Sequence, residues 1–318
     1  MKKPLYKTRK GRYLIGDSVA TLQGLLKKGL KGKVQLIMTS PPFPLNKKKK
    51  YGNLQSEEYK NWLAELAPLF SALLKKNGSI VMEMGNSWEP GRPVQSLLSL
   101  ESLLAFVRHP KADLRLCQEF ICYNPSRLPS PAQWVTVDRI RTTDSYTHVW
   151  WMSKSDLPKA DNRKVLRPYS DSMLSLLKSQ KYNAGKRPSE HVIGEKSFLT
   201  NHGGSIMPNL IELEKIDPNR DLRLPPNVFS ISNTVSNDPF SLACKKKGIV
   251  PHPARMQQGL VNFFIEFLTS KGDLVLDPFG GSNTTGYCAE KLGRKWISID
   301  IDKQYGRQSK LRFKKRQP

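Results

Sequence analysis

The residues of this chain that could do chemistry begin with a short loop at positions 39–43, directly after the apolar run 34–38. The apolar run predicts a buried strand that ends where the loop starts. The loop has two consecutive prolines without a backbone N–H, so it offers carbonyl oxygens with few competing donors. With the Ser40 hydroxyl and the Phe43 ring, it suits a planar base whose exocyclic amine must be held by its hydrogens. An ordinary Pro-Pro turn is the alternative for this segment alone.

A second informative segment lies near the C-terminus. Its pattern predicts a strand at 273–277, a glycine-rich turn at 278–286, a helix at 287–292 and a strand at 294–300. The second strand ends in an acidic residue, where nucleotide-binding units place the group that binds ribose hydroxyls. The glycines do not fit G-x-G-x-x-G and no lysine follows, so the turn suits a nucleoside without phosphates, such as S-adenosylmethionine. A plain βαβ crossover is the alternative for this segment alone.

Together the two segments resemble the β class of amino-methylating DNA methyltransferases, in which the catalytic motif precedes the cofactor motif. The resemblance covers most of the chain, and both motifs occur in the expected order and separation. It is carried by the segments 15–18, 39–43, 51–54, 124–126, 149–151, 252–255 and 277–286. The layout looks like that of an N4-cytosine-specific enzyme of a type II restriction–modification system.

The resemblance implies a Rossmann-like α/β fold with a mostly parallel, doubly wound sheet in circularly rearranged order. We expect residues 1–152 to form the catalytic half, 153–247 an inserted target-recognition region, and 248–318 the cofactor half with a basic tail. The implied cofactor is S-adenosylmethionine. The residues expected to bind it are Asp17, His252, Pro253, Asp277, Pro278, Phe279, Gly280, Gly281, Ser282, Asn283, Thr284, Thr285 and Asp300. A helix cap is the alternative role for Asp17.

The implied reaction is methyl transfer to the N4 amine of a cytosine in duplex DNA. This amine attacks poorly because its lone pair is delocalised into the ring, so Ser40 Oγ and the Pro41 carbonyl oxygen are expected to accept its two hydrogens. Such catalysis works by positioning and electrostatics, without a covalent intermediate. The base must be flipped out of the stack, and Phe43, after Pro42, is expected to stack on it. Glu83 is expected to orient Ser40 or to help remove the surplus proton; its alternative role is a surface carboxylate.

Other reactions remain open at this point. Related N6-adenine enzymes usually carry Asp or Asn where Ser40 stands, but the same acceptors could serve either amine. A non-catalytic nucleic-acid-binding protein linked to the same cofactor is a further alternative, against which the intact motifs argue, and charge alone does not exclude RNA. Methylation at C5 of cytosine needs a thiolate, which the enzymes of that family carry in a Pro-Cys dipeptide. None of the four cysteines follows a proline; they are Cys117, Cys122, Cys244 and Cys288.

The composition agrees with a nucleic-acid partner. The 318 residues include 52 Lys and Arg against 27 Asp and Glu, a net charge of +25, which favours a polyanion. Four consecutive cations next to the proposed base pocket, Lys47, Lys48, Lys49 and Lys50, are expected to contact DNA phosphates, with a solvated loop as the alternative. The cysteines and histidines show no metal-ligand or disulfide spacing, and no apolar run is long enough to span a membrane. We therefore expect a cytoplasmic protein without metal. The resemblance further implies a functional link to a cognate restriction endonuclease.

Overall fold

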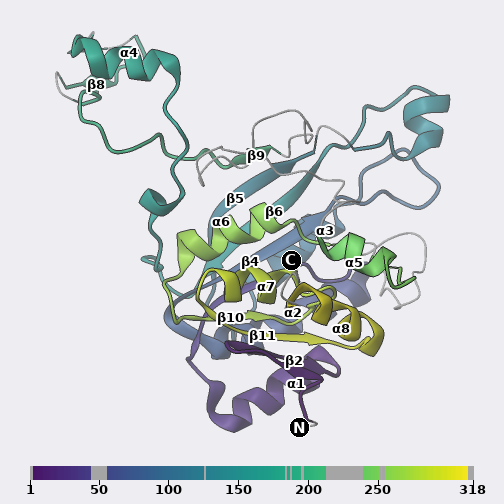
Figure 1. Ribbon diagram of the computed structural model, residues 1–318. Coiled ribbons are helices and arrows are strands. Elements are labelled where there is room, and N and C mark those ends of the chain that lie inside the picture. Colours follow the sequence, from purple (N-terminus) through teal and green to yellow (C-terminus); the bar gives the residue numbers. More distant parts are fainter. Residues whose placement is uncertain are drawn as a thin grey trace.

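The computed structural model describes residues 3–43, 56–124, 127–182, 185–186, 188–194, 197–212, 239–250, 252 and 255–313. They form a mixed nine-stranded sheet with the order β1-β2-β11-β10-β3-β4-β6-β5-β9, covered by helices on both faces (Figure 1). Its strands are β1 (Tyr6–Lys7), β2 (Gly11–Ile15), β3 (Val34–Thr39), β4 (Leu74–Gly85), β5 (Arg115–Tyr123), β6 (Tyr146–Ser153), β9 (Leu210–Glu212), β10 (Leu274–Asp277) and β11 (Lys295–Asp300). A separate hairpin pairs β7 (Gly185–Lys186) with β8 (Val192–Ile193).

Strand direction decides which loops meet. The neighbours β2, β11, β10, β3 and β4 are parallel, so their carboxyl ends share one edge, hereafter the carboxyl edge. Strand β6 runs antiparallel to both β4 and β5, so the connection from β5 to β6 lies at the same edge. Because β10 and β11, late in the sequence, lie between β2 and β3, the two motifs of the sequence come together there.

The helices bury their apolar faces on the sheet. One face is covered by α1 (Ser18–Leu25), α2 (Ser56–Leu73) and α3 (Leu98–Val107), and the other by α6 (Gln258–Leu268) and α7 (Thr284–Lys291). Helix α6 buries Leu260, Phe264 and Leu268 at helical spacing. Burial of each such side chain stabilises the fold by roughly 1.5–3 kcal/mol. The remaining helices are η1 (Leu26–Leu30), η2 (Gln133–Val137), η3 (Asn162–Val165), α4 (Asp171–Ser179), α5 (Pro239–Lys245), α8 (Lys303–Ser309) and η4 (Lys310–Phe313).

The predicted doubly wound, mostly parallel fold is confirmed, but several boundaries were wrong. The apolar pattern predicts a helix over 252–269, but α6 begins only at Gln258. The apolar pattern likewise predicts a helix over 57–74, but Leu74 is the first residue of β4, and a bulge opposite Val34 accommodates the extra residues. Within the segment 153–247, β9 pairs with β5 and so extends the main sheet.

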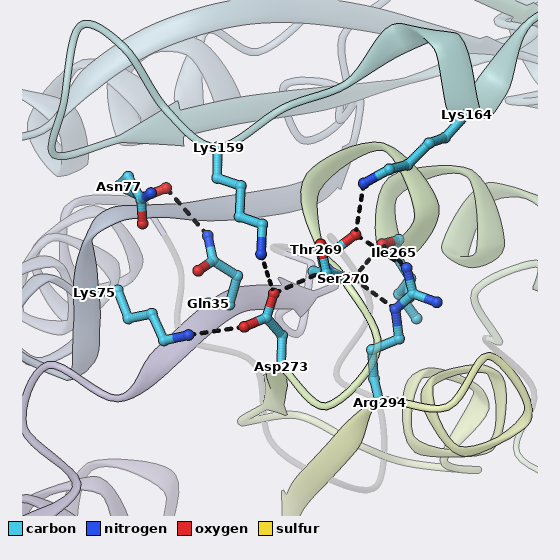
Figure 2. Close-up of polar contacts among 10 residues, drawn as sticks. All are labelled: Gln35, Lys75, Asn77, Lys159, Lys164, Ile265, Thr269, Ser270, Asp273 and Arg294. Carbon is cyan, nitrogen blue, oxygen red and sulfur yellow. Dashed lines mark hydrogen bonds and ion pairs between the residues drawn. The ribbon is translucent and has the colours of Figure 1, made fainter.

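At the edge opposite the carboxyl edge, the carboxylate of Asp273 holds three segments of the chain together. Lys75 and Lys159 both point toward this carboxylate (Figure 2). Lys75 Nζ donates to Oδ1 at 2.8 Å and Lys159 Nζ donates to Oδ2 at 2.6 Å, and Oδ2 also accepts the Ser270 backbone N–H at 2.9 Å. Burial alone would raise the pKa of Asp273, but the hydrogen bonds from Lys159 and Lys75 outweigh it and lower the pKa to about 2. The contact ties the start of β10 to β4 and to the segment after β6.

Asp273→Asn should lower the melting temperature at neutral pH. Because the folded pKa lies below the value of roughly 4 for an unfolded aspartate, the ionised group stabilises the fold above pH 4, and this contribution is lost as pH falls toward 2. Thermal melts of both proteins should therefore differ at pH 7 and converge near pH 2. Glu101→Gln, an exposed carboxylate on α3, is the control and should change the melting temperature little. A constant Asp273→Asn deficit down to pH 2 would contradict this account.

Candidate active site at the carboxyl edge

The first motif forms a loop at the end of β3. Thr39 and Pro41 are buried, and Ser40, Pro42 and Phe43 are half-buried. The Phe43 ring lies against Gly85 at the end of β4, where a Cβ would come within 2.9 Å of the ring. Only glycine therefore lets the ring lie against the end of this strand.

Glu83 lies beside this loop on the neighbouring strand. Thr39 pairs with Met82, so the next residues along, Ser40 and Glu83, follow on adjacent strands and project toward the same side. The Glu83 carboxylate accepts a hydrogen bond from Thr147 Oγ1 at 3.2 Å. Burial raises the pKa of Glu83 to about 7, although Thr147 and Arg127 oppose this. A half-buried carboxyl with this pKa can take up a proton near neutral pH, which argues against a plain surface role.

A buried carboxylate joins the loop to the second motif. Asp277 is 1% exposed; its Oδ1 accepts hydrogen bonds from Thr39 Oγ1 at 2.9 Å and from the Phe279 N–H at 3.1 Å, and its Oδ2 accepts one from Thr285 Oγ1 at 2.7 Å. Burial raises the pKa of Asp277 to about 6, and the hydrogen bonds from Thr285, Phe279 and Thr39 limit the rise. The residue before Ser40 is thus fixed to both sides of the glycine-rich turn.

The turn itself is held from β11 and β2. Asp300 accepts hydrogen bonds from the Gly281 N–H at 2.7 Å and from the Asp302 N–H at 2.8 Å, while Tyr13 donates to the Gly281 carbonyl at 2.8 Å. Gly281 has a φ of +45°, and a Cβ at Gly280 would lie 2.9 Å from the Ser298 Cβ. Both positions therefore require glycine, which explains the Gly-Gly pair of the motif.

The helix that follows the turn starts with a left-handed residue. Asn283, with φ 57°, caps α7 by accepting the Gly286 N–H at 3.1 Å, and Ser298 donates to the same oxygen at 2.6 Å. Arg312 Nε donates to the Ser282 carbonyl at 2.7 Å, and its Nη2 lies 3.3 Å from Thr284 Oγ1. The sequence pattern missed Arg312, because a basic tail gives no signal that one of its cations is buried.

Asp17 and His252 both lie close to the turn. Asp17 caps α1 by accepting the Ala20 N–H at 2.9 Å, and the next residue, Ser18, donates to the Pro278 carbonyl at 2.6 Å. A Cβ on Gly281 would lie 3.6 Å from the His252 ring, which packs edge-on against Tyr305. The other predicted site residues, Pro253, Lys47, Lys48, Lys49 and Lys50, lie outside the described residues.

Two buried cysteines, Cys122 and Cys288, are held as neutral thiols. Burial raises the pKa of Cys122 and of Cys288 to about 12, so both thiols stay protonated at neutral pH. Within the described part of the chain, no three His, Cys, Asp or Glu side chains are grouped to hold a metal ion. No described helix has the length and apolar character needed to cross a bilayer.

Comparisons with known proteins agree with this geometry. A family model described as DNA methylase matches residues 34–311. The type II methyltransferase M.PvuII of Proteus hauseri is 41% identical over 98% of this chain and 86% of its own length. A solved structure of PvuII DNA methyltransferase (cytosine-N4-specific) superposes with a TM-score of 0.74 at 35% identity, covering 100% of this chain and 91% of that one. An M1.HpyAVI–SAM complex, 18% identical, covers 95% of this chain and 100% of that one with a TM-score of 0.52 and shares the fold. The chain therefore belongs to the DNA methylase family.

Proposed function

We propose that this protein transfers a methyl group from S-adenosylmethionine to the N4 amine of a flipped cytosine in duplex DNA. The observation that carries the proposal is the Asp277 bridge, which holds the Ser40 loop against the glycine-rich turn. Similarity to a cytosine-N4-specific enzyme over nearly the whole chain favours cytosine over adenine. The methylation is proposed to protect the DNA from a cognate restriction enzyme.

The glycine-rich turn and its surroundings are proposed to bind the cofactor. Asp300 would accept hydrogen bonds from the ribose hydroxyls, and Asp17 would contact the adenine, as the resemblance implies. The remaining contacts are assigned to the turn and to the segment packed on it, namely Asp277, Pro278, Phe279, Gly280, Gly281, Ser282, Asn283, Thr284, Thr285, His252 and Pro253. When bound, the cofactor supplies an electrophilic sulfonium methyl group.

The Ser40 loop is proposed to activate the amine. Ser40 Oγ and the Pro41 carbonyl oxygen accept its two N–H hydrogens, which returns electron density to the nitrogen and directs it toward the methyl group. After transfer the nitrogen carries one proton too many. Glu83, with its pKa near 7, is proposed to accept that proton or to orient the Ser40 hydroxyl. No covalent bond forms between the base and the protein.

DNA is proposed to approach the carboxyl edge, since the flipped base must reach the Ser40 loop. Pro42 fixes the loop so that the Phe43 ring can stack on the extruded base. Lys47, Lys48, Lys49 and Lys50 follow directly in the sequence and are proposed to bind backbone phosphates.

Mass spectrometry of nucleosides from DNA treated with the enzyme and S-adenosylmethionine tests the proposed reaction. N4-methylcytosine is the expected product. N6-methyladenine would assign the same acceptors to adenine, and modification of RNA alone would overturn the DNA assignment. Mapping the modified positions would give the target sequence.

Asp300→Ala should weaken binding of S-adenosylmethionine by about 1.5–3 kcal/mol, the range for hydrogen bonds to a charged group. The substitution removes the proposed ribose acceptor and also the support of the Gly281 N–H. Calorimetric titration measures the change. Asp302→Ala, which removes the side-chain cap of α8 but keeps the backbone N–H that Asp300 accepts, is the control and should retain affinity. Unchanged affinity of Asp300→Ala would remove this residue from the site.

A further inference from the structure

The connection between β5 and β6, described at residue 124 and over 127–145, has no part in the chemistry above. It leaves β5 at Tyr123 and enters β6 at Tyr146, so it projects from the carboxyl edge (Figure 1). Strand β6 is two strands away from β3 in the sheet, about 10 Å at the usual spacing of neighbouring strands. Any duplex that delivers a base to the Ser40 loop therefore approaches this connection too.

The distal part of the connection has a defined backbone. After the short helix η2, the Ile140 and Arg141 N–H groups both donate to the Trp134 carbonyl, at 2.9 and 3.2 Å. Gln133 Nε2 donates to Asp138 Oδ1 at 2.9 Å, and Arg139 adopts a left-handed conformation with φ 55°. The turn 133–141 is therefore already ordered before binding, so binding does not carry the entropic cost of ordering a loop.

The connection is also anchored to the body of the protein. Arg141 Nη1 donates to the Pro93 carbonyl at 3.0 Å, and its Nη2 lies 3.4 Å from Asp144 Oδ2. At the base of the connection, Arg127 Nη1 donates to the Tyr146 carbonyl at 3.0 Å. These contacts fix the turn relative to the carboxyl edge, where the substrate is converted.

This rigid turn exposes large apolar side chains to solvent. Val137 is 66% and Ile140 is 62% exposed, and the exposed cation Arg139 lies between them in the sequence. Leu128, nearer the base of the connection, is 80% exposed. Apolar side chains that occupy the gap left by an unstacked base, combined with cations for phosphates, are a known way for proteins to distort a duplex. Continuity with the carboxyl edge makes duplex DNA the partner that fits this surface.

We propose that the turn 133–141 contacts the duplex beside the displaced cytosine, with Val137 and Ile140 packed against the bases next to the gap and Arg139 bound to a backbone phosphate. The assignment rests on the proposed function only in that the substrate is duplex DNA with an extruded base. It gives the β5–β6 connection a role in opening the base pair that is separate from the chemistry of Ser40.

The test compares a Val137→Ser/Ile140→Ser double variant with a Leu157→Ser control, which alters an 86% exposed leucine at the opposite edge, after β6. Duplex affinity is measured by fluorescence anisotropy, and turnover is measured on a duplex that contains an unmethylated target site. The double variant should lose on the order of 10-fold in kcat/KM on the normal duplex, while its affinity for S-adenosylmethionine and the turnover of the control stay unchanged. A duplex with an abasic site opposite the target cytosine should recover most of the lost kcat/KM, because the cytosine then has no pairing partner.

Equal kcat/KM for the double variant and the wild type would overturn the proposal, as would a loss that the abasic duplex does not relieve. Arg139→Gln is a second arm that leaves the apolar side chains in place. It should reduce the slope of log affinity against log salt by about one, the value for one phosphate contact, whereas Arg163→Gln at the opposite edge should not. An unchanged slope for Arg139→Gln would also contradict the proposal. A wild-type enzyme that makes no N4-methylcytosine but shows these duplex effects would refute the proposed function and leave this inference standing.

Discussion

Ser40→Ala should lower the rate of methyl transfer by on the order of 10²-fold, by analogy with the loss of one preorganised oxyanion-hole donor. The hydroxyl is proposed to accept an N–H of the target amine mainly in the transition state, when the nitrogen becomes positive and its hydrogens bind more strongly. An interaction of that kind changes kcat much more than it changes the affinity for either substrate. The affinities for DNA and for S-adenosylmethionine should therefore stay within about twofold of wild type, because the substitution removes no interaction that is already made in the ground state.

Single-turnover kinetics separate methyl transfer from product release and measure this effect directly. Ser155→Ala is the matched control, because Ser155 also carries a hydroxyl in a short connection but lies after β6, at the opposite edge. Undiminished turnover of Ser40→Ala would show that the loop 39–43 is only a turn. A large rise in the dissociation constant for DNA at constant kcat would assign Ser40 to binding.

The sequence was sufficient to predict the elements that carry both motifs, because each has a local pattern. The apolar runs before Thr39 and before Asp277 are short and bounded by turn residues, which is the signature of buried parallel strands. The glycines of the turn after β10 also gave a local signal in the sequence. Gly281 has a left-handed conformation and Gly280 lies close to Ser298, so both positions require glycine. The carboxyl edge then followed from the rule that parallel strands place their ligands there.

The contacts between the motifs could not be predicted in the same way. Thr39 and Asp277 are 238 positions apart, and nothing in either local pattern indicates that their side chains meet. The direction of β5 and β6 also depends on which edge of β4 is unoccupied, which only the folded sheet decides. For that reason the position of the β5–β6 connection, at the same edge of the sheet as the Ser40 loop, became visible only in three dimensions.

The Asp277 bridge leads to a second prediction with a large expected effect, because Thr39→Val removes the hydroxyl and keeps the side-chain volume nearly constant. Loss of a hydrogen bond to a buried carboxylate should lower the free energy of unfolding by about 1.5–3 kcal/mol at pH 7. It should also slow methyl transfer, since Ser40 follows Thr39 directly and small displacements of a positioned group reduce the rate steeply. Thr39→Ser, which retains the hydroxyl, should preserve most of both properties.

The pH dependence distinguishes this bridge from simple packing. Burial already raises the pKa of Asp277 to about 6, and the hydrogen bond from Thr39 lowers it, so Thr39→Val should raise the pKa further. The folded pKa of Asp277 exceeds the unfolded value of roughly 4, so the folded protein loses stability as pH rises from the unfolded pKa to the folded pKa. Thr39→Val loses more stability than the wild type, because its folded pKa is higher still. Denaturant unfolding should therefore show the deficit of Thr39→Val at its largest above pH 7 and shrinking toward pH 5. A deficit that does not change between pH 5 and 8 would mean that Thr39 acts through packing, and that the link between the loop and the turn does not depend on the Asp277 charge.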